Sequence, residues 1–356
     1  MASSKWGTGA AKILAVLVLA LPVPAAAAEC PSLTRIASLA LEPAIERKES
    51  YVPVLIAGVP KLMLLDTGGA MTEITTEAAD ELHLVRRRGN FRLYNMYGEY
   101  SDQFAESSLT IGPLEADAMA LAIAPGSRIF GEDRGIAGVL APDILKNYDI
   151  DIDFGGDRLN LFSPDHCEGK VVYWPAPSVA VIPMRVLHSG HIVVPVTLDG
   201  QPVTAILDTG AYHTTLTVPI AENQFHLRLG SSEAPVSGHL TGKPNAPTYR
   251  HIFRSLAFEG IVVNNLQVEI IPDLMHQVVI DAAAPPTGTR IADPRKMEAD
   301  ASMLIGMNIL RHFHIYIAYR EEKLYVTPTV ENPVLPPVAD APAEAVPTHL
   351  RLRVER

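Results

Sequence analysis

Two short strings of the sequence have the residue types and the spacing to do acid and base chemistry. An Asp-Thr-Gly motif occurs at 66–68 and again at 208–210, and each copy follows a short apolar run. Two carboxylates a few ångströms apart repel each other, so that together they hold one proton. One then acts as a base and the other as an acid. The chemistry requires Asp66 and Asp208 to meet in one site.

The two motifs belong to an internal repeat. A shift of 142 residues (208 − 66) places Val52-Pro53-Val54 on Val194-Pro195-Val196. The same shift aligns glycine, proline and threonine positions: Gly58 with Gly200, Pro60 with Pro202, Thr72 with Thr214 and Thr75 with Thr217. A single Asp-Thr-Gly tripeptide arises easily by chance, whereas two copies in matching contexts indicate two related halves.

With these motifs the chain resembles the aspartic proteases of the pepsin and retropepsin superfamily, in the single-chain, two-lobed form and nearest the bacterial retropepsin-like type. The resemblance implies a mostly β fold with two homologous β-barrel lobes and a central cleft. It also implies that Asp66 and Asp208 are catalytic. Thr67 and Thr209 would interlock between the lobes, and Gly68 and Gly210 would permit the tight turns that present the carboxylates.

The function implied by this resemblance is that of an aspartic endopeptidase, a hydrolase that splits peptide bonds with a water activated between Asp66 and Asp208. Such an enzyme acts on a peptide or protein substrate, works as a monomer and requires neither a metal nor an organic cofactor. The alternative is a catalytically silent two-lobed protein of the cell envelope that binds peptides or regulates. A β-rich scaffold in which Asp-Thr-Gly only makes turns is the third possibility.

Composition supports the β-rich reading and excludes one class of partner. Short runs of Val, Ile, Leu and Thr, punctuated by Gly and Pro, are typical of strands. The 356 residues are enough for two domains of ordinary size. The formal net charge of −11 argues against a nucleic-acid partner, whose phosphates require a basic surface.

The sequence divides into four segments. Residues 1–28 have two lysines, an apolar run and an alanine-rich end, which predicts a signal peptide and an exported protein, periplasmic or secreted, without stable membrane insertion after cleavage. An uncleaved anchor is the alternative. Residues 36–175 and 176–328 are the predicted N-terminal and C-terminal lobes, and 329–356 is a Pro/Ala-rich tail.

The only two cysteines are Cys30 and Cys167. In an exported protein an even pair indicates a disulfide more often than two free thiols. The bond would connect the start of the mature chain to the end of the first lobe.

A long hairpin is predicted from Phe91 to Leu114, with its turn near Tyr97 and Gly98. The resemblance implies a flap that closes over the substrate, with Tyr94, Tyr97 or Tyr100 near its tip. An ordinary surface hairpin whose tyrosines pack on a neighbour fits the pattern equally well.

Each half ends in an apolar string followed by paired strands. In the family this apolar string contains a glycine that packs behind the catalytic loop and braces it. Gly306 fits, whereas the first half has Ala141, which makes the bracing of Asp66 less certain than that of Asp208. The residue after each motif, Gly69 or Ala211, lacks the hydroxyl that many pepsin-like enzymes use to stabilise the ionised aspartate. Losing such a donor raises a carboxyl pKa, so we expect a pH optimum less acidic than that of a digestive pepsin.

Two further groups resemble metal ligands. Asp149, Asp151 and Asp153 alternate with isoleucines, and we expect them to form the solvent face of a strand because the remaining residues of a calcium loop are missing. His312 and His314 share a strand face, but no third ligand follows at a recognisable spacing, so no metal site is predicted.

Overall fold

The structure is a computed structural model that describes most of the chain. The described residues are 30–44, 48–95, 99–125, 135–187, 189–240, 243–272, 301–329 and 339–340. The predicted leader at 1–28, Tyr97 and Gly98 of the hairpin, and most of the predicted tail at 329–356 lie outside them. No helix in the described part is long and apolar enough to cross a membrane.

The first barrel arises from strands with alternating apolar residues. In β3 (Ser50–Ile56) the side chains of Val52, Val54 and Ile56 are at most 4% exposed and pack in the core. The order β3-β4-β9-β5-β8-β7 closes into a ring of six strands because β7 also pairs with β3. The other elements of this half are β2 (Glu42–Pro43), β4 (Val59–Leu65), β5 (Glu73–Ile74), α1 (Thr76–Glu81), β6 (Arg86–Tyr94), β7 (Tyr100–Ile111), β8 (Leu114–Ile123), β9 (Ile136–Leu140) and α2 (Pro142–Leu145).

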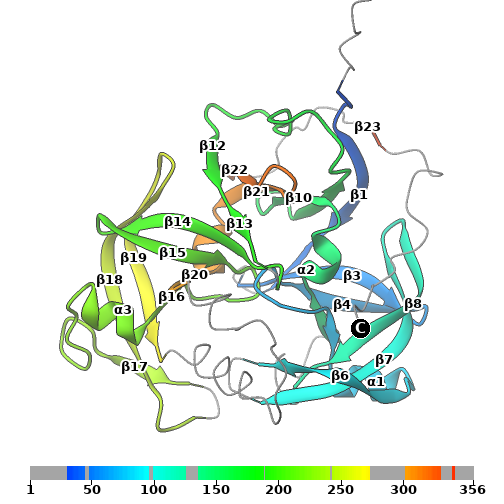
Figure 1. The fold of residues 1–356 in the computed structure, drawn as a ribbon, viewed down its shortest axis with the longest axis horizontal. Helices are drawn as coiled ribbons and strands as arrows, with labels where there is room; N and C mark the ends of the chain where they lie inside the picture. The colour runs from blue at the N-terminus through cyan, green and yellow to red at the C-terminus, as the bar shows by residue number, and fades with distance from the viewer. Residues whose placement is uncertain are drawn as a thin grey trace, which may run out of the picture. The chain divides into compact units, whose positions relative to one another are not determined.

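The second barrel has the same construction (Figure 1). Its order β14-β15-β20-β16-β19-β18 closes because β18 pairs with β14. Its elements are β13 (Arg185–Val186), β14 (Ile192–Leu198), β15 (Gln201–Leu207), β16 (Thr215–Thr217), α3 (Val218–Asn223), β17 (Val236–His239), β18 (Pro247–Phe258), β19 (Ile261–Ile271), β20 (Met303–Ile305) and α6 (Met307–Leu310). The predicted mostly β fold with two barrel lobes is confirmed.

The repeat extends to the bounds of the elements. β3, β4 and α1 coincide with β14, β15 and α3 after the shift of 142 residues. The shift grows to 147 between β7 and β18 (247 − 100) and to 165 between α2 and α6 (307 − 142). The second half is therefore longer through insertions that leave the Asp-Thr-Gly strands unchanged.

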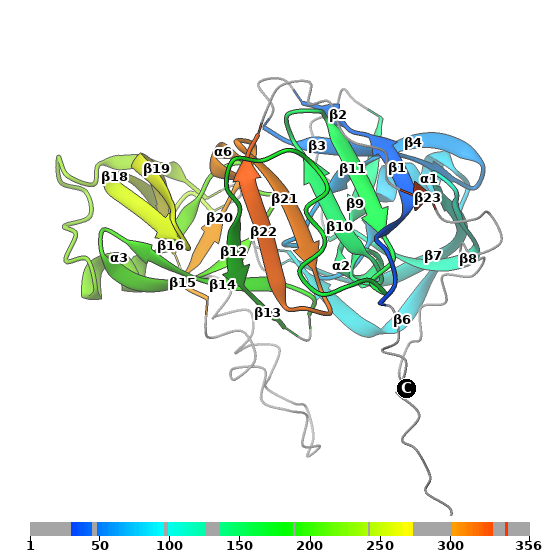
Figure 2. The same cartoon turned by 90° about the horizontal axis from the view of Figure 1, so that it is seen from above.

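A third sheet combines strands from both halves. Its order is β12-β22-β21-β10-β11-β1-β23, and β10 pairs with β21 in the antiparallel sense, with Ile150 opposite Ile317. Figure 2 shows β22, β21, β10 and β11 side by side. The members are β1 (Thr34–Ala40), β10 (Asp149–Asp153), β11 (Arg158–Phe162), β12 (Ala180–Pro183), β21 (Phe313–Ala318), β22 (Lys323–Pro328) and β23 (Ala339–Asp340). Hydrogen bonds between β10 and β21 therefore join the two halves directly.

The aspartates of β10 do not face solvent, so that prediction is wrong. Asp149, Asp151 and Asp153 are at most 1% exposed, and Ile150 and Ile152 on the other face belong to the main core. The predicted alternation is present, but both faces of the strand are covered. A buried carboxylate requires hydrogen-bonding partners, since an unpaired one would be strongly destabilising.

The cover on the aspartate face is the connecting segment at 163–179. The hydroxyl of Tyr173 donates to Oδ2 of Asp151 at 2.5 Å. Trp174 stacks on His314 with ring centroids 3.8 Å apart, and Nε2 of His314 lies 2.5 Å from Oδ1 of Asp151. His314 is thus a buried partner of an aspartate.

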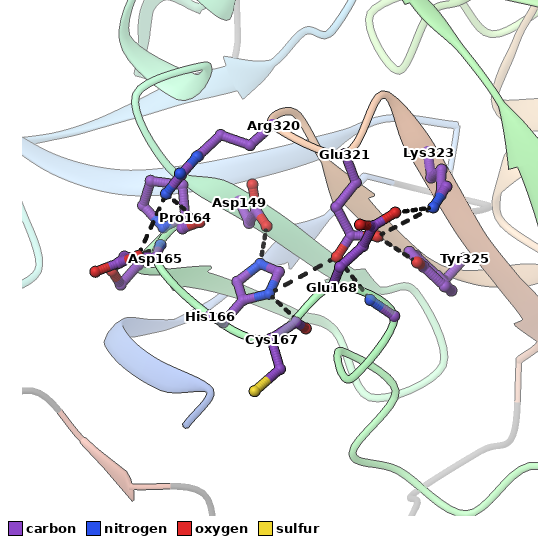
Figure 3. Close-up of polar contacts among 12 residues, drawn as sticks. Asp149, Pro164, Asp165, His166, Cys167, Glu168, Arg320, Glu321, Lys323 and Tyr325 are labelled. Carbon is purple, nitrogen blue, oxygen red and sulfur yellow. Dashed lines mark hydrogen bonds and ion pairs between the residues drawn. The ribbon is translucent and has the colours of Figure 1, made fainter. Parts of the chain in front are cut away.

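A second histidine of the same segment pairs with the next aspartate. His166 lies between Asp149 and Glu321 (Figure 3). Its Nε2 is 2.6 Å from Oδ2 of Asp149, while its Nδ1 is 3.7 Å from Oε1 of Glu321. Desolvation raises the pKa of Asp149, although the hydrogen bond and the charge of His166 act in the opposite direction. Asp149 and Asp151 thus each have a histidine partner in the layer between segment and sheet.

The predicted disulfide is confirmed. Both Cys30 and Cys167 are disulfide-bonded, and they are the only cysteines of the sequence. The backbone amide of Cys167 also donates to the carbonyl of Pro31 at 3.1 Å. Closing so long a loop stabilises the folded state by about 5 kcal/mol in the chain-entropy model.

Replacing Asp151 by alanine should destabilise the shared sheet strongly. Asp151→Ala removes the acceptor for Tyr173, Asn160 and His314, and leaves these groups buried without it. The expected loss is about 3 kcal/mol in the free energy of unfolding, measured by chemical denaturation with the disulfide intact.

The matched control is Asp165→Ala. Asp165 is in an exposed ion pair with Arg320, in which both side chains are more than 60% exposed. Its removal should change the free energy of unfolding by less than about 1 kcal/mol. Equal effects of the two substitutions would contradict a stabilising role for the buried network.

Candidate active site

The two aspartates are at the ends of equivalent strands. Asp66 follows β4, and its amide donates to the carbonyl of Leu140 on β9 at 3.1 Å. Asp208 follows β15, and its amide donates to Ile305 on β20 at 3.0 Å. In both barrels the backbone of the aspartate is therefore hydrogen-bonded to a neighbouring parallel strand.

Four hydrogen bonds connect the two motif loops. The amide of Thr67 donates to Oγ1 of Thr209 at 3.0 Å, and the amide of Thr209 donates to Oγ1 of Thr67 at 3.1 Å. Each hydroxyl donates in turn to the opposite chain, Thr67 to Leu207 at 2.8 Å and Thr209 to Leu65 at 2.7 Å. Both threonines are fully buried, so water does not compete for these bonds. The interlock implied by the resemblance is present.

The motif glycines allow the two carboxyl groups to meet. A Cβ atom on Gly68 would lie 2.4 Å from Cγ of Asp208, and one on Gly210 would lie 2.4 Å from Cγ of Asp66. Any side chain at either position would displace the opposite aspartate. With glycine at both positions, the carboxyl group of each aspartate lies directly against the backbone of the other motif.

The backbone supports the two carboxylates unequally. Oδ1 of Asp208 accepts hydrogen bonds from the amides of Gly210 at 2.9 Å and Ala211 at 3.0 Å. Oδ1 of Asp66 accepts from the amide of Gly68 at 2.8 Å, and the described residues contribute no second backbone donor to it. Hydrogen bonds to the charged form favour ionisation, so Asp208 is the better stabilised anion.

Desolvation raises the pKa of both aspartates. For Asp66 the charge of Asp208 adds to this effect, so that its pKa lies well above the usual range. For Asp208 the hydrogen bonds from the amides of Gly210 and Ala211 oppose desolvation, and its pKa stays above the usual range. Each carboxyl group therefore holds its proton more firmly than a free aspartate does.

Each aspartate loop is braced by a threonine and by the turn after the closing strand. Oγ1 of Thr72 donates to Asp143 at 2.6 Å, and Oγ1 of Thr214 donates to Asn308 at 2.7 Å. The sequence analysis did not identify this role, although both threonines align under the shift of 142. Asp143 and Asn308 are equivalent only under the shift of 165, which the structure revealed.

The alanine at 141 does not weaken the bracing in the way the sequence suggested. The amide of Ala141 donates to Oγ1 of Thr72 at 3.1 Å, as the amide of Gly306 does to Thr214. A Cβ atom on Gly69 would lie 3.2 Å from the Cβ atom of Ala141, so glycine at 69 leaves room for this methyl group. In the second half a Cβ atom on Gly306 would lie 2.7 Å from the carbonyl of Ala211. Glycine and alanine have exchanged places between the halves.

The sequence analysis did not identify two further titratable residues near the aspartate pair. Glu73 is 9% exposed, and burial together with the charge of Asp143 raises its pKa to about 7. His191 is 6% exposed and lies close enough to Asp208 to lower the pKa of that carboxyl. No repeat signal could have found them, because Glu73 aligns with Thr215 and His191 with Glu49.

The predicted flap hairpin is described only in part. β6 and β7 pair in the antiparallel sense, with Tyr94 opposite Tyr100, and the amide of Asn95 donates to the carbonyl of Glu99 across the turn. Tyr97 and Gly98 lie outside the described residues. The role of Tyr94, Tyr97 and Gly98 in substrate binding stays a prediction.

Comparison with known proteins agrees with this geometry. Residues 52–141 and 194–309 match a family model described as aspartyl protease, which covers more than half of the chain and includes both aspartates. The chain belongs to the aspartyl protease family. No curated protein matches its sequence. Among solved structures, the aspartic proteinase from Irpex lacteus is similar, with a TM-score of 0.46 and 12% identity over 83% of this chain and 98% of that one.

Removing one hydroxyl of the interlock should destabilise this family member measurably. Thr67→Val leaves the amide of Thr209 and the carbonyl of Leu207 buried without their partner. The expected loss is about 2 to 4 kcal/mol in the free energy of unfolding. Thr197→Val is the control, because Thr197 is exposed and makes a single long hydrogen bond of 3.4 Å. A loss for Thr67→Val no larger than for this control would show that the interlock is not stabilising.

Proposed function

We propose that the chain is an aspartic endopeptidase, in which a water between Asp66 and Asp208 attacks the peptide bond. The observation that carries this proposal is the packing of each aspartate carboxyl group against the glycine of the other motif, which brings the two buried carboxyl groups into one site. Family membership supports the reaction class, and peptides or proteins are the substrates that this class of enzyme takes.

In the first step the pair adds water to the peptide carbonyl. The ionised carboxylate takes one proton from the water, whose oxygen forms a bond to the carbonyl carbon. The protonated carboxyl gives its proton to the carbonyl oxygen, which receives the electron pair of the C=O bond. The product is a neutral diol, and the two carboxyl groups have exchanged protonation states.

In the second step the diol collapses. The carboxyl that took the water proton now donates it to the amide nitrogen, and the C–N bond breaks with its electron pair on nitrogen. The other carboxylate removes a proton from one hydroxyl as the C=O bond forms again. An acid and an amine leave, and the pair returns to its original protonation state.

We further propose that the protein works outside the cytoplasm, in the periplasm or as a secreted enzyme. The apolar leader at 1–28 motivates this location. The disulfide between Cys30 and Cys167 supports it, because such bonds persist in oxidising compartments.

Loss of either aspartate should slow cleavage strongly. The purified mature chain, incubated with a mixed peptide library from about pH 3 to about pH 7, should cut peptides. Asp66→Asn and Asp208→Asn should each lower the rate on the order of 10²-fold to 10⁴-fold, because each removes one proton acceptor or donor. Mass spectrometry of the products gives rate and specificity together.

The control is Asp165→Asn, an exposed site, which should cleave at the wild-type rate. Folded wild type that binds peptides and cuts none would contradict the enzyme and indicate a silent binding protein. Cleavage at the wild-type rate in both active-site variants would show that another group performs the reaction.

The pH optimum should be less acidic than that of a digestive pepsin. Activity requires one proton on the pair, and it falls at high pH when the raised pKa of Asp66 is passed and at low pH when Asp208 becomes protonated. Since both pKa values lie above the usual range, the whole profile moves toward neutral pH. A profile of kcat/KM that peaks below about pH 3 would contradict this expectation.

A further inference from the structure

The outer side of the first barrel has an apolar face, which we define by Pro53, Leu55, Pro60 and Leu62 on β3 and β4. Leu55 is opposite Pro60 and Pro53 is opposite Leu62, so the four side chains share one side of the strand pair. Leu55 is 37% exposed, and Pro60 is exposed as well. The core-facing residues of β3 lie on the other side.

The equivalent surface of the second barrel is polar. The shift of 142 residues places Leu55 on Thr197 and Leu62 on Thr204. These threonines belong to β14 and β15, which pair in the same register as β3 and β4. A strand side that faces water is expected to be polar, as it is here. Leucine at both positions of the first half therefore indicates a surface that another group covers.

A groove of about 530 Å³ lies along the apolar face, and all four residues of the face are part of its lining. This volume is within the range of sites that enclose a ligand or several side chains. The apolar face is thus hollowed as well as exposed.

Acidic groups are at the rim of this groove. Glu42 of β2 is part of the lining. Thr110 of β7, also in the lining, is opposite Glu115 of β8, so Glu115 is on the same side of the sheet. The lining residue Lys61 pairs with Glu81 at 2.6 Å. Carboxylates beside an apolar surface fit a segment that combines apolar and basic side chains.

The sequence contains such a segment after β23. Residues 350–354, which we call the docking segment, read Leu-Arg-Leu-Arg-Val. This strict alternation predicts a strand with one apolar side and one basic side. The docking segment differs in this respect from the residues rich in proline and alanine that precede it.

β23 leads the chain toward the groove. It pairs with β1 in the parallel sense, with Asp340 opposite Arg35, so the chain after Asp340 continues in the direction of β1. β1 ends at Ala40, just before Glu42 of the groove. An extended chain covers about 23 Å from Arg35 to Glu42, and it can span about 33 Å from Asp340 to Leu350. The docking segment is therefore within reach of the groove.

The last part of β1 is in direct contact with the groove wall. A Cβ atom on Gly112, a residue of the lining, would lie 2.6 Å from Cδ2 of Leu39 in β1. A chain that follows β1 beyond Arg35 thus arrives at this wall.

We propose that the docking segment lies in the groove and covers the apolar face of the first barrel. Its leucines and valine pack on Leu55 and Leu62, and its arginines are near Glu42 and Glu115. The occupant is a segment of the same chain because β23 already tethers it close to the groove, which gives it a high effective concentration there. The inference does not depend on the proposed endopeptidase function.

The test is disulfide trapping in the purified mature chain. In the variant Leu55→Cys with Leu352→Cys, mild oxidation with glutathione disulfide should join the two new thiols within one molecule. The control is Thr197→Cys with Leu352→Cys, which places the thiol at the equivalent site of the second barrel and should react about tenfold more slowly or less. Mass spectrometry of the digest identifies the joined peptides and verifies the native bond between Cys30 and Cys167.

Three results would overturn the proposal. These are equal rates of bond formation at positions 55 and 197, no bond at position 55 in folded protein, and a bond that joins two molecules. The last is detected by mixing ¹⁴N-labelled and ¹⁵N-labelled variants, and it would assign the groove to a second copy of the chain.

A second measurement needs no new cysteines. Trypsin should cut slowly after Arg351 and Arg353 in the native wild type, because a docked segment is protected. Leu55→Thr with Leu62→Thr gives the first barrel the threonines of the second and should raise this rate about tenfold or more. The control Val262→Thr, at a valine 56% exposed on β19 of the second barrel, should leave the rate unchanged. Equal rates in wild type and in the double variant would contradict docking on the apolar face.

Discussion

The crossed hydrogen bonds between Thr67 and Thr209 are the constraint on which the rest of the site depends. Two acidic side chains do not approach each other without cost, because desolvation and mutual repulsion both oppose their ionisation. The four bonds of the interlock are buried and hold together the two loops that carry the carboxyl groups. Gly68 and Gly210 then remove the last steric obstacle. The hydrogen bonds of the two threonines thus hold the carboxyl groups close together against their mutual repulsion.

The shared sheet serves the same purpose at a distance from the loops. β10 and β21 continue from the turns that brace Asp66 and Asp208, and their pairing joins the two halves through backbone hydrogen bonds. The segment at 163–179 covers this sheet with histidine and tyrosine partners for buried aspartates. A layer of this kind has few alternative arrangements, since each acidic group would be left unpaired by any shift in register.

Duplication explains why the two aspartate loops have the same construction, and a few departures from the repeat give the two aspartates different surroundings. Gly69 packs beside Ala141, and Ala211 packs beside Gly306, so each close contact joins one glycine and one alanine. In both halves the amide after the closing strand still donates to the threonine hydroxyl. Oδ1 of Asp208 also accepts a hydrogen bond from the amide of Ala211, and the described residues supply no matching second backbone donor to Asp66. An acid and a base need different proton affinities, and small local differences of this kind can supply them.

The sequence by itself determined the repeat, the aspartate pair, the threonine partners, the β-rich class and the cysteine pair, because each is written in residue identity and spacing. It determined the alternation in β10, but not that Asp149, Asp151 and Asp153 would be buried. An alternating pattern shows only that the two faces of a strand differ. A covering segment without regular secondary structure has no periodic pattern, so the sequence does not predict it. Likewise the placement of Glu73 and His191 beside the pair was decided by tertiary structure alone. Their neighbours come from distant strands, and a side chain's electrostatic environment is set by what is close in space.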